Sequence, residues 1–429
     1  MKKIVYVVLD GLGDLPIKSL GGKTPLEAAE TPNMDRLARE GVTGRMYTVG
    51  KGIAPQSDIA VISILGYDPN VYYTGRGPLE SFASGLEVRD GDLALRVNFA
   101  TVDENWNIID RRVGRNLSSE EARELAEAIN REVKLTSVPA TFQFKSTIGH
   151  RGCLVIRAEK GKLSGEVTNT DPAYDKIGPL GVAKEKFENV VQEAKPTKGH
   201  ENDPAAINAA KLINEFTRKS YEVLNRHPIN LKRRSEGKMV GNMILCRDAG
   251  DHLPKFPPFR ERFGLNFASF VEMPVERGIA VLMGIEIVKL PLPSGDLARD
   301  YVERAELAVE NIKRFDGLYI HIKGPDEPAH DGDAERKKQV IEIIDRHFFG
   351  PLLERLDLKE AIVTVTADHS TPCEHKAHTD DPVPILISGG NIRPDGSESF
   401  SERVAEKGSI GLLEKGTEFV PLLIRKSRL

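Results

Sequence analysis

Aspartate and histidine side chains gather just after apolar segments of this sequence. Three of the 10 histidines in the 429-residue chain lie close together, with Glu374, in the segment 363–384, "VTVTADHSTPCEHKAHTDDPVP". Similar residues follow the apolar runs at 4–9 and 318–322. The seven candidate groups are Asp10, Asp326, His330, Asp368, His369, His375 and His378. Carboxylate and imidazole are ligands that suit Zn²⁺ or Mn²⁺.

The segments before these groups have the pattern of buried parallel strands. The runs at 4–10, 316–324, 361–370 and 382–390 are short, apolar and mostly rich in β-branched residues. Helical spacing precedes or separates them at 31–41, 57–66, 297–315 and 333–356. Alternation of strand and helix predicts an α/β fold with a mainly parallel sheet and helices on both faces.

Ligands in open parallel sheets bind at the carboxyl ends of the strands. A single aspartate there is commonly a cap or a turn residue, and an Asp-x-x-x-His pair alone is weak evidence for a metal. Three different strands, however, deliver such groups to one edge of the predicted sheet. A hydrated acidic rim would explain the carboxylates but not the histidines.

Seven groups are too many for one tetrahedral ion but suit two ions that each keep an open position. Two metal ions about 3.5–4 Å apart can stabilise the entering and leaving oxygens of a phosphoryl transfer. Such a reaction needs a nucleophile, and Ser57 stands where the helix 57–66 begins. A serine there is usually an N-cap, so capping is the alternative to a covalent nucleophile.

The middle of the chain has a different pattern. A helix with a capping start at Ser118 or Ser119, paired strands within 141–161 and a long helix at 203–227 indicate α+β structure. We therefore expect an inserted α+β domain at 96–228. The core domain would be discontinuous, formed by 1–95 and 229–429.

Composition narrows the class of protein. Apolar residues make up 40% and charged residues 29%, with a net charge of −4, which argues against nucleic acid or an anionic membrane as the main partner. No segment approaches the roughly 20 apolar residues of a membrane span, and the N-terminal run is too short for a signal peptide. The three cysteines favour a reducing cytoplasm over a disulfide framework. The sequence does not indicate an oligomeric state.

Five segments resemble those of a known group of enzymes. They are "VVLDGLGD", "PQSD", "GPDEPAHDGD", "TADHSTP" and "KAHTDDPVP". Together they are similar to the alkaline phosphatase superfamily, and most of all to its archaeal-type cofactor-independent phosphoglycerate mutases. The resemblance covers both ends of the chain and extends more loosely into its middle.

The resemblance implies a fold, a ligand set and a reaction. It implies an alkaline-phosphatase-like core with two divalent ions, Mn²⁺ or Zn²⁺, with Co²⁺ and Mg²⁺ as further candidates. One ion would be held by Asp326, His330 and His378, and the other by Asp10, Asp368, His369 and the Ser57 oxygen. His375 is not implied as a ligand, and a supporting or surface position is expected for it.

The implied reaction interconverts 2- and 3-phosphoglycerate through a phosphoserine at Ser57, without bisphosphoglycerate. A phosphomonoester hydrolase or another phosphomutase on the same core is the alternative, and a catalytically silent metal-binding protein is a third possibility. A mutase must exclude water and retain the glycerate, which gives the inserted domain a role as a cap over the substrate.

Such a cap should offer cations to the substrate carboxylate, preferably arginine. Each candidate is individually more typical of a solvated surface charge, and Asp171, the candidate general base, also suits a turn before proline. Lys323 and Arg76 are candidates for contact with phosphate. The full set is Arg76, Arg111, Arg112, Arg115, His150, Arg151, Asp171, Arg247, Arg277 and Lys323.

Overall fold

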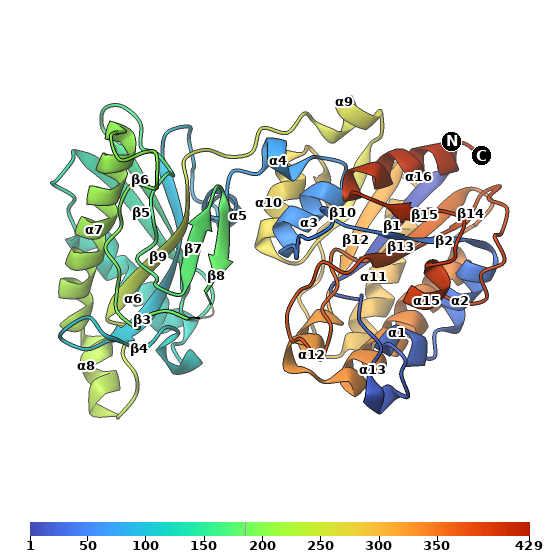
Figure 1. Cartoon of the computed structure of the whole chain (residues 1–429), viewed down its shortest axis with the longest axis horizontal. Coiled ribbons are helices and arrows are strands. Elements are labelled where there is room, and N and C mark those ends of the chain that lie inside the picture. The colour runs from blue at the N-terminus through green and yellow to red at the C-terminus, as the bar shows by residue number, and fades with distance from the viewer. Residues whose placement is uncertain (185) are drawn as a thin grey trace. The chain divides into compact units, whose positions relative to one another are not determined.

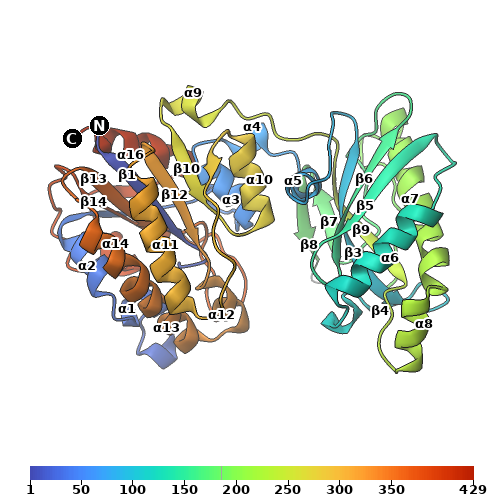
Figure 2. The same ribbon diagram turned by 180° about the vertical axis from the view of Figure 1, so that it is seen from behind.

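The computed structural model describes residues 1–184 and 186–429 and divides into two compact units. Unit 1 is formed by Met1–Tyr72 and Lys255–Leu429, and unit 2 by Tyr73–Pro254. Figures 1 and 2 show the elements of each unit from opposite sides. Both termini belong to unit 1, where the Lys2 amide donates to the Ser427 carbonyl at 2.7 Å.

The observed units differ in their boundaries from the predicted domains 1–95 with 229–429 and 96–228. Strand β3 (Leu93–Val102) starts before the predicted insert, and β9 (Met243–Gly250) lies beyond its end. These two strands pair with each other in the sheet of unit 2. Residues 73–95 and 229–254 therefore belong with the insert, because the long-range pairing of β3 with β9 holds them there.

An eight-stranded sheet forms the centre of unit 1. In spatial order its strands are β11 (Glu286–Ile287), β10 (Phe267–Phe270), β12 (Gly317–Ile322), β1 (Lys3–Leu9), β13 (Ala361–Thr366), β14 (Val383–Gly389), β2 (Gly41–Met46) and β15 (Gly411–Leu413). Only the β13–β14 and β14–β2 pairs are antiparallel. The prediction of a mainly parallel α/β sheet is confirmed.

Helices cover both faces of this sheet. The helices of unit 1 are α1 (Pro25–Ala28), α2 (Pro32–Arg39), α3 (Ser57–Ile64), α4 (Pro69–Tyr72), α9 (Phe259–Phe263), α10 (Pro274–Leu282), α11 (Leu297–Asn311), α12 (Asp326–Asp331), α13 (Ala334–Ile344), α14 (Gly350–Arg355), α15 (Glu402–Ala405) and α16 (Phe419–Ser427). Figure 2 shows α11 in front of the strands, whereas Figure 1 shows α16 in front of them. The Tyr6 side chain marks the α16 face, because its ring contacts Phe419 with centroids 5.2 Å apart.

The predicted helix at 333–356 is divided into three pieces. Residues Asp345–Phe349 form a π-helical turn between α13 and α14. The buried Asp345 carboxylate within that turn accepts hydrogen bonds from the Asn33 and Met34 amides at the start of α2. The turn thus binds α2 to the helical layer formed by α13 and α14.

Unit 2 has α+β character. All pairs in its five-stranded sheet are antiparallel and join β3 and β9 to β4 (Ile108–Asp110), β5 (Ala140–Ser146) and β6 (Arg151–Ala158). A separate hairpin joins β7 (Tyr174–Ile177) to β8 (Leu180–Ala183). The helices are α5 (Arg76–Ala83), α6 (Ser119–Glu132), α7 (Pro204–Asn225) and α8 (Pro228–Ser235).

The predicted capping start at Ser118 is confirmed. The α6 helix begins with a capping box in which Ser118 and Glu121 exchange hydrogen bonds. The cysteines Cys153, Cys246 and Cys373 are buried free thiols. Among the described residues, no helix combines the length and the apolar character that a membrane crossing requires.

Candidate metal centre

Three parallel strands bring their carboxyl ends to the same edge of the unit 1 sheet. Strand β1 lies between β12 and β13 and is parallel to both. Asp10 directly follows β1, and its amide continues the ladder by donating to the Ile322 carbonyl at 3.0 Å. Asp368 and His369 follow β13 two and three residues after its end. The parallel order inferred from the apolar runs therefore places these groups together.

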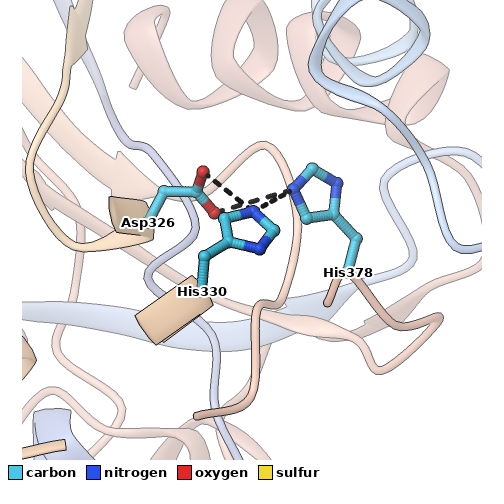
Figure 3. Close-up of side chains that lie close together, drawn as sticks. All are labelled: Asp326, His330 and His378. Atoms are coloured by element: carbon cyan, nitrogen blue, oxygen red, sulfur yellow. Dashed lines mark hydrogen bonds and ion pairs between the residues drawn. The ribbon is translucent and has the colours of Figure 1, made fainter. Parts of the chain in front are cut away.

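The first cluster consists of Asp326, His330 and His378, drawn in Figure 3. Helix α12 presents Asp326 and His330 on one face, because residues i and i+4 of a helix are neighbours. His330 Nε2 lies 3.3 Å from Asp326 Oδ2, and His378 Nε2 lies 3.6 Å from Asp326 Oδ1. The two Nε2 atoms are 3.2 Å apart. One cation could be held by all three side chains.

The outer nitrogens of these two rings face backbone carbonyls. His330 Nδ1 lies 3.0 Å from the Lys376 oxygen, and His378 Nδ1 lies 2.8 Å from the Pro55 oxygen. A carbonyl can only accept, so each Nδ1 carries the proton and donates it. In the neutral rings both Nε2 atoms then present lone pairs to the cluster, which is the tautomer that a metal requires.

The second cluster surrounds His369 at the end of β13. His369 Nε2 lies 3.3 Å from Asp10 Oδ1, 3.2 Å from Asp368 Oδ2 and 3.1 Å from Ser57 Oγ. Its Nδ1 lies 3.0 Å from Thr371 Oγ1, whose hydroxyl donates to Asp326 Oδ1 at 2.7 Å. Because that hydroxyl proton is used on Asp326, Thr371 accepts from His369 Nδ1–H. In its neutral form His369 therefore has its proton on Nδ1 and its Nε2 lone pair toward Asp10, Asp368 and Ser57.

The two clusters adjoin each other. The His369 and His378 rings are stacked with centroids 3.6 Å apart, and Asp10, Asp326 and His369 form a third group of atoms close enough to share an ion. The geometry therefore brings together every residue of the two ligand sets predicted above.

The donor set fits divalent cations. Asp10 Oδ1 and Asp368 Oδ2 are buried and have no hydrogen-bond partner, and a buried carboxylate oxygen without a donor is costly. Burial alone would lower the pKa of His369, but Asp368 and Asp10 outweigh it and raise that pKa to about 10. This part of the protein thus favours positive charge, which a metal ion would supply.

Ser57 is the first residue of α3 rather than its cap. The N-cap residue is Gln56, so the capping alternative for Ser57 is wrong. Its hydroxyl instead faces His369 at the edge of the second cluster. The position at the start of a helix also places the serine in the positive end of the helix dipole.

Lys323 and Arg277, the two predicted substrate residues in unit 1, have different surroundings. Lys323 Nζ lies 2.6 Å from Asp10 Oδ2 and 2.7 Å from Glu276 Oε1. Burial would lower the pKa of Lys323, but these two carboxylates raise it above its usual range. Arg277 and His375 are exposed, so His375 has the surface position expected for it.

The other predicted substrate residues all belong to unit 2. Asp171 is buried and accepts two hydrogen bonds from Arg111, at 3.0 and 2.7 Å, and one from Arg247 at 3.1 Å. The Arg247 guanidinium also lies over the Tyr174 ring, 4.3 Å from its centroid. This arrangement fixes the carboxylate between two cations on β9 and the segment after β4.

Several further cations of unit 2 act on His150. Burial and the charges of Arg151, Arg112, Arg247 and Arg115 lower the pKa of His150 to about 4. Arg76, at the start of α5, pairs with Glu80 at 2.6 Å. The positive field around a neutral imidazole is suited to an anion.

Two residues of unit 1 were not predicted and border the second cluster. His321 lies within β12, and Glu276 lies on α10; both are almost fully buried. His321 carried a signal in the sequence, because it interrupts an apolar strand two residues before Lys323. Nothing in the sequence indicated Glu276, since its helix lies 45 residues or more from the other groups in the chain.

Comparison with known proteins identifies the family. The family model described as 2,3-bisphosphoglycerate-independent phosphoglycerate mutase matches residues 38–230. Enzymes of that name from Aeropyrum pernix and Methanopyrus kandleri are 47% and 42% identical, covering 98% and 96% of this chain and 98% and 93% of their own length. A solved protein structure from Pyrococcus horikoshii is similar with a TM-score of 0.79 and 33% identity, covering 100% of this chain and 97% of its own.

The solved cofactor-independent phosphoglycerate mutase from Thermoplasma acidophilum is also similar, with a TM-score of 0.69, 31% identity and full coverage of both chains. The match extends over both units and includes the segments that bear the aspartate and histidine clusters. The chain belongs to the family of 2,3-bisphosphoglycerate-independent phosphoglycerate mutases.

Proposed function

We propose that this chain interconverts 2-phosphoglycerate and 3-phosphoglycerate and that Ser57 carries the phosphoryl group between the two hydroxyls. The observation that supports the proposal most directly is the position of the Ser57 hydroxyl, 3.1 Å from His369 Nε2 beside two candidate metal clusters. Family membership over nearly the whole chain supports an isomerase rather than an unrelated enzyme on the same fold.

Two divalent cations are part of the proposal. One is assigned to Asp326, His330 and His378, and the other to Asp10, Asp368, His369 and the Ser57 oxygen. Bound there, divalent ions would lower the pKa of the serine hydroxyl and stabilise charge on phosphoryl oxygens. Mn²⁺ and Zn²⁺ suit the mixed Asp/His ligands best, with Co²⁺ and Mg²⁺ as further candidates. Bisphosphoglycerate is not required.

The proposed steps balance within the substrate and the enzyme. The Ser57 hydroxyl loses its proton and its oxygen forms a bond to phosphorus as the bond from phosphorus to one glycerate oxygen breaks, and that glycerate oxygen takes up a proton. The other glycerate hydroxyl then loses a proton and its oxygen bonds to phosphorus as the bond from phosphorus to Ser57 breaks, and the Ser57 oxygen takes up a proton. The glycerate must stay bound between the two transfers, and water must be kept from the phosphoserine.

We assign the handling of the glycerate to unit 2, as expected for a substrate-capping insert. Its cationic groups suit the substrate carboxylate, for which arginine offers two parallel hydrogen bonds. Asp171, fixed between Arg111 and Arg247, is the proposed proton acceptor for the glycerate hydroxyls. The substrate is a small anion, and the proposed location is the cytoplasm.

Separate measurement of two products tests the proposal. The protein is incubated with 3-phosphoglycerate and Mn²⁺, and 2-phosphoglycerate and free phosphate are followed separately. Formation of 2-phosphoglycerate is expected, and a dominant release of free phosphate would instead identify a phosphomonoester hydrolase. No turnover with either Mn²⁺ or Zn²⁺ would contradict both activities.

The Ser57→Ala variant tests the covalent route. We expect phosphoryl transfer to be lost while the fold and the affinity for metal at the Asp326 cluster are retained, because the alanine removes one oxygen at the second cluster only. Circular dichroism and metal binding by equilibrium dialysis provide the controls. Full mutase activity in this variant would eliminate the phosphoserine.

A further inference from the structure

His321 lies directly beneath the second cluster and has no role in the ligand set described above. It is part of β12, where its neighbour across the ladder is Val8 of β1. Side chains alternate between the two faces of a strand, so Val8 and Asp10 share one face, and His321 and Lys323 share the same face. Because its partner Val8 comes two residues before Asp10, His321 lies deeper in the sheet than Asp10, on the same face. Its side chain is fully buried.

Three buried atoms without hydrogen-bond partners meet at this point. They are Asp10 Oδ1, Asp368 Oδ2 and His321 Nε2. His321 Nε2 lies 3.6 Å from Asp368 Oδ2, and Asp10, His321 and Asp368 each offer a ligand atom within 4.8 Å of those of the other two. Both carboxylate oxygens can only accept, and buried polar atoms are rarely left unsatisfied.

The other side of the His321 ring faces groups that favour a proton on Nδ1. The Tyr319 hydroxyl lies 3.1 Å from Nδ1, and Glu276 Oε2 lies 3.7 Å from it. Glu276 Oε2 is itself buried without a hydrogen-bond partner. A proton on Nδ1 points toward a carboxylate, whereas a lone pair there would face its negative charge. This leaves Nε2 as a third acceptor among the unsatisfied atoms.

The orientation of His321 matches that of the three predicted histidine ligands. In His330, His369 and His378 the Nδ1 side faces a protein acceptor and the Nε2 side faces the clusters. His321 has the same orientation, with the Tyr319 hydroxyl 3.1 Å and Glu276 Oε2 3.7 Å from its Nδ1. A carboxylate behind a histidine is a common way to orient a metal ligand.

We infer that His321 is a further nitrogen ligand of the cation held by Asp10, Asp368 and His369. The inference rests on the proposed function only in that it uses the second cation of that site. A second imidazole there would favour Zn²⁺ and Co²⁺, and to a smaller extent Mn²⁺, over Mg²⁺, which prefers oxygen ligands. The second ion would thus be bound by two nitrogens and by oxygens of Asp10, Asp368 and Ser57.

The competing explanation is a buried imidazolium. In that case His321 carries protons on both nitrogens and bridges Asp368 and Glu276 as a cation, with no bond to a metal. A glutamine side chain can donate a hydrogen bond from the position of Nε2, so it would then preserve the interaction with Asp368. It could not replace a nitrogen that binds a metal. The two explanations therefore predict different results for His321→Gln.

Metal binding by the full-length protein distinguishes them. Chelator-treated wild type and His321→Gln are titrated with Mn²⁺, Co²⁺ and Mg²⁺ by equilibrium dialysis, and the Co²⁺ absorption spectrum is recorded at each step. We expect the variant to keep one cation at wild-type affinity and to bind the other at least about 10-fold more weakly, with a smaller preference for Mn²⁺ over Mg²⁺. His347→Gln provides the matched control, because His347 is a histidine of unit 1 that belongs to none of the clusters; its affinities should equal those of the wild type.

A measurement on the wild-type protein covers the case in which His321→Gln does not fold. The protein is labelled with ¹⁵N-histidine and titrated with Zn²⁺, and the ring nitrogens are followed by NMR. A shift of His321 Nε2 to a metal-bound position supports the inference. Unchanged metal affinities and Co²⁺ spectrum in His321→Gln, or a His321 ring that keeps both protons with Zn²⁺ bound, would overturn it. Mutase activity is measured separately, so that a protein with this ligand but no turnover would contradict only the proposed function.

Discussion

A single buried ammonium group connects the loops that carry the two metal clusters. Lys337 of α13 is fully buried, and its Nζ donates to the Gly13 carbonyl at 3.1 Å, to Asp14 Oδ2 at 2.9 Å and to the Thr371 carbonyl at 3.0 Å. Gly13 and Asp14 follow Asp10 in the chain, whereas Thr371 follows His369. We therefore predict that Lys337→Met destabilises unit 1 strongly.

The magnitude follows from what the substitution leaves behind. Methionine retains much of the apolar stem but removes the charge and all three hydrogen bonds. The Asp14 carboxylate, which is buried, keeps the amides of Leu15 and Cys373 as donors but loses its cationic partner. Removing one partner of a buried ion pair costs about 3–5 kcal/mol, which is a large part of the 5–15 kcal/mol typical of a folded protein.

Urea unfolding followed by circular dichroism measures this loss. The single tryptophan, Trp106, belongs to unit 2, so its fluorescence reports separately on the unit that was not changed. Lys338→Met is the matched control, because Lys338 is the next residue of the same helix and its partners Glu335 and Glu342 are on the surface; little change is expected there. A loss below about 1 kcal/mol for Lys337→Met would refute the assignment of a buried, uncompensated Asp14 charge.

Two further predictions concern one side chain in each unit. His378→Ala should weaken metal binding and mutase activity by more than about 100-fold, beyond the effect of losing a supporting group, whereas His375→Ala, three residues earlier and exposed, should change neither; equal losses in dialysis and rate assays would contradict this. In unit 2, burial alone would raise the pKa of Glu215, but Lys219 and the donors of Ser137 lower it from 4.5 to about 2. A lowered pKa stabilises the folded state above pH 4.5, and this contribution is lost as the pH falls toward 2. The stability deficit of Glu215→Gln, measured by urea unfolding with tryptophan fluorescence, should therefore shrink over that range, and a deficit independent of pH would contradict the argument.

The parts of the site that could be predicted are those that depend on residues close together in the sequence. Apolar runs identify β1, β12 and β13, and the rule that parallel strands align their carboxyl ends then places Asp10 and Asp368 together. The i, i+4 spacing of Asp326 and His330 likewise needs only the start of a helix. These features depend on neighbours in the sequence and on one rule of topology.

The parts that could not be predicted depend on partners far apart in the chain. The boundaries of the observed units differ from the predicted ones because β9 pairs with β3 across about 150 residues, and nothing within either segment specifies that pairing. Glu276 reaches Lys323 and His321 only because α10 packs beside them. The role of Ser57 was ambiguous for the same reason. An N-cap serine and a nucleophile at the first helical position differ by one residue in the sequence, and the group that its hydroxyl faces comes from a distant part of the chain.

The position of β1 in the sheet has a consequence for how the metal centre forms. Of the eight strands, only β1 and β2 come from the part of the chain before unit 2, and β1 lies between β12 and β13 from the part after it. Asp10 at the end of β1 meets Lys323 from one neighbouring strand and His369 from the other. A strand with partners on both sides cannot be released without breaking two ladders, so the position of Asp10 depends on both neighbouring strands. Lys323 after β12 and His369 after β13 both lie against Asp10, so the two neighbouring strands also bring the groups that offset its charge. The ligand arrangement is thus a property of the whole unit 1 fold rather than of any one of its loops.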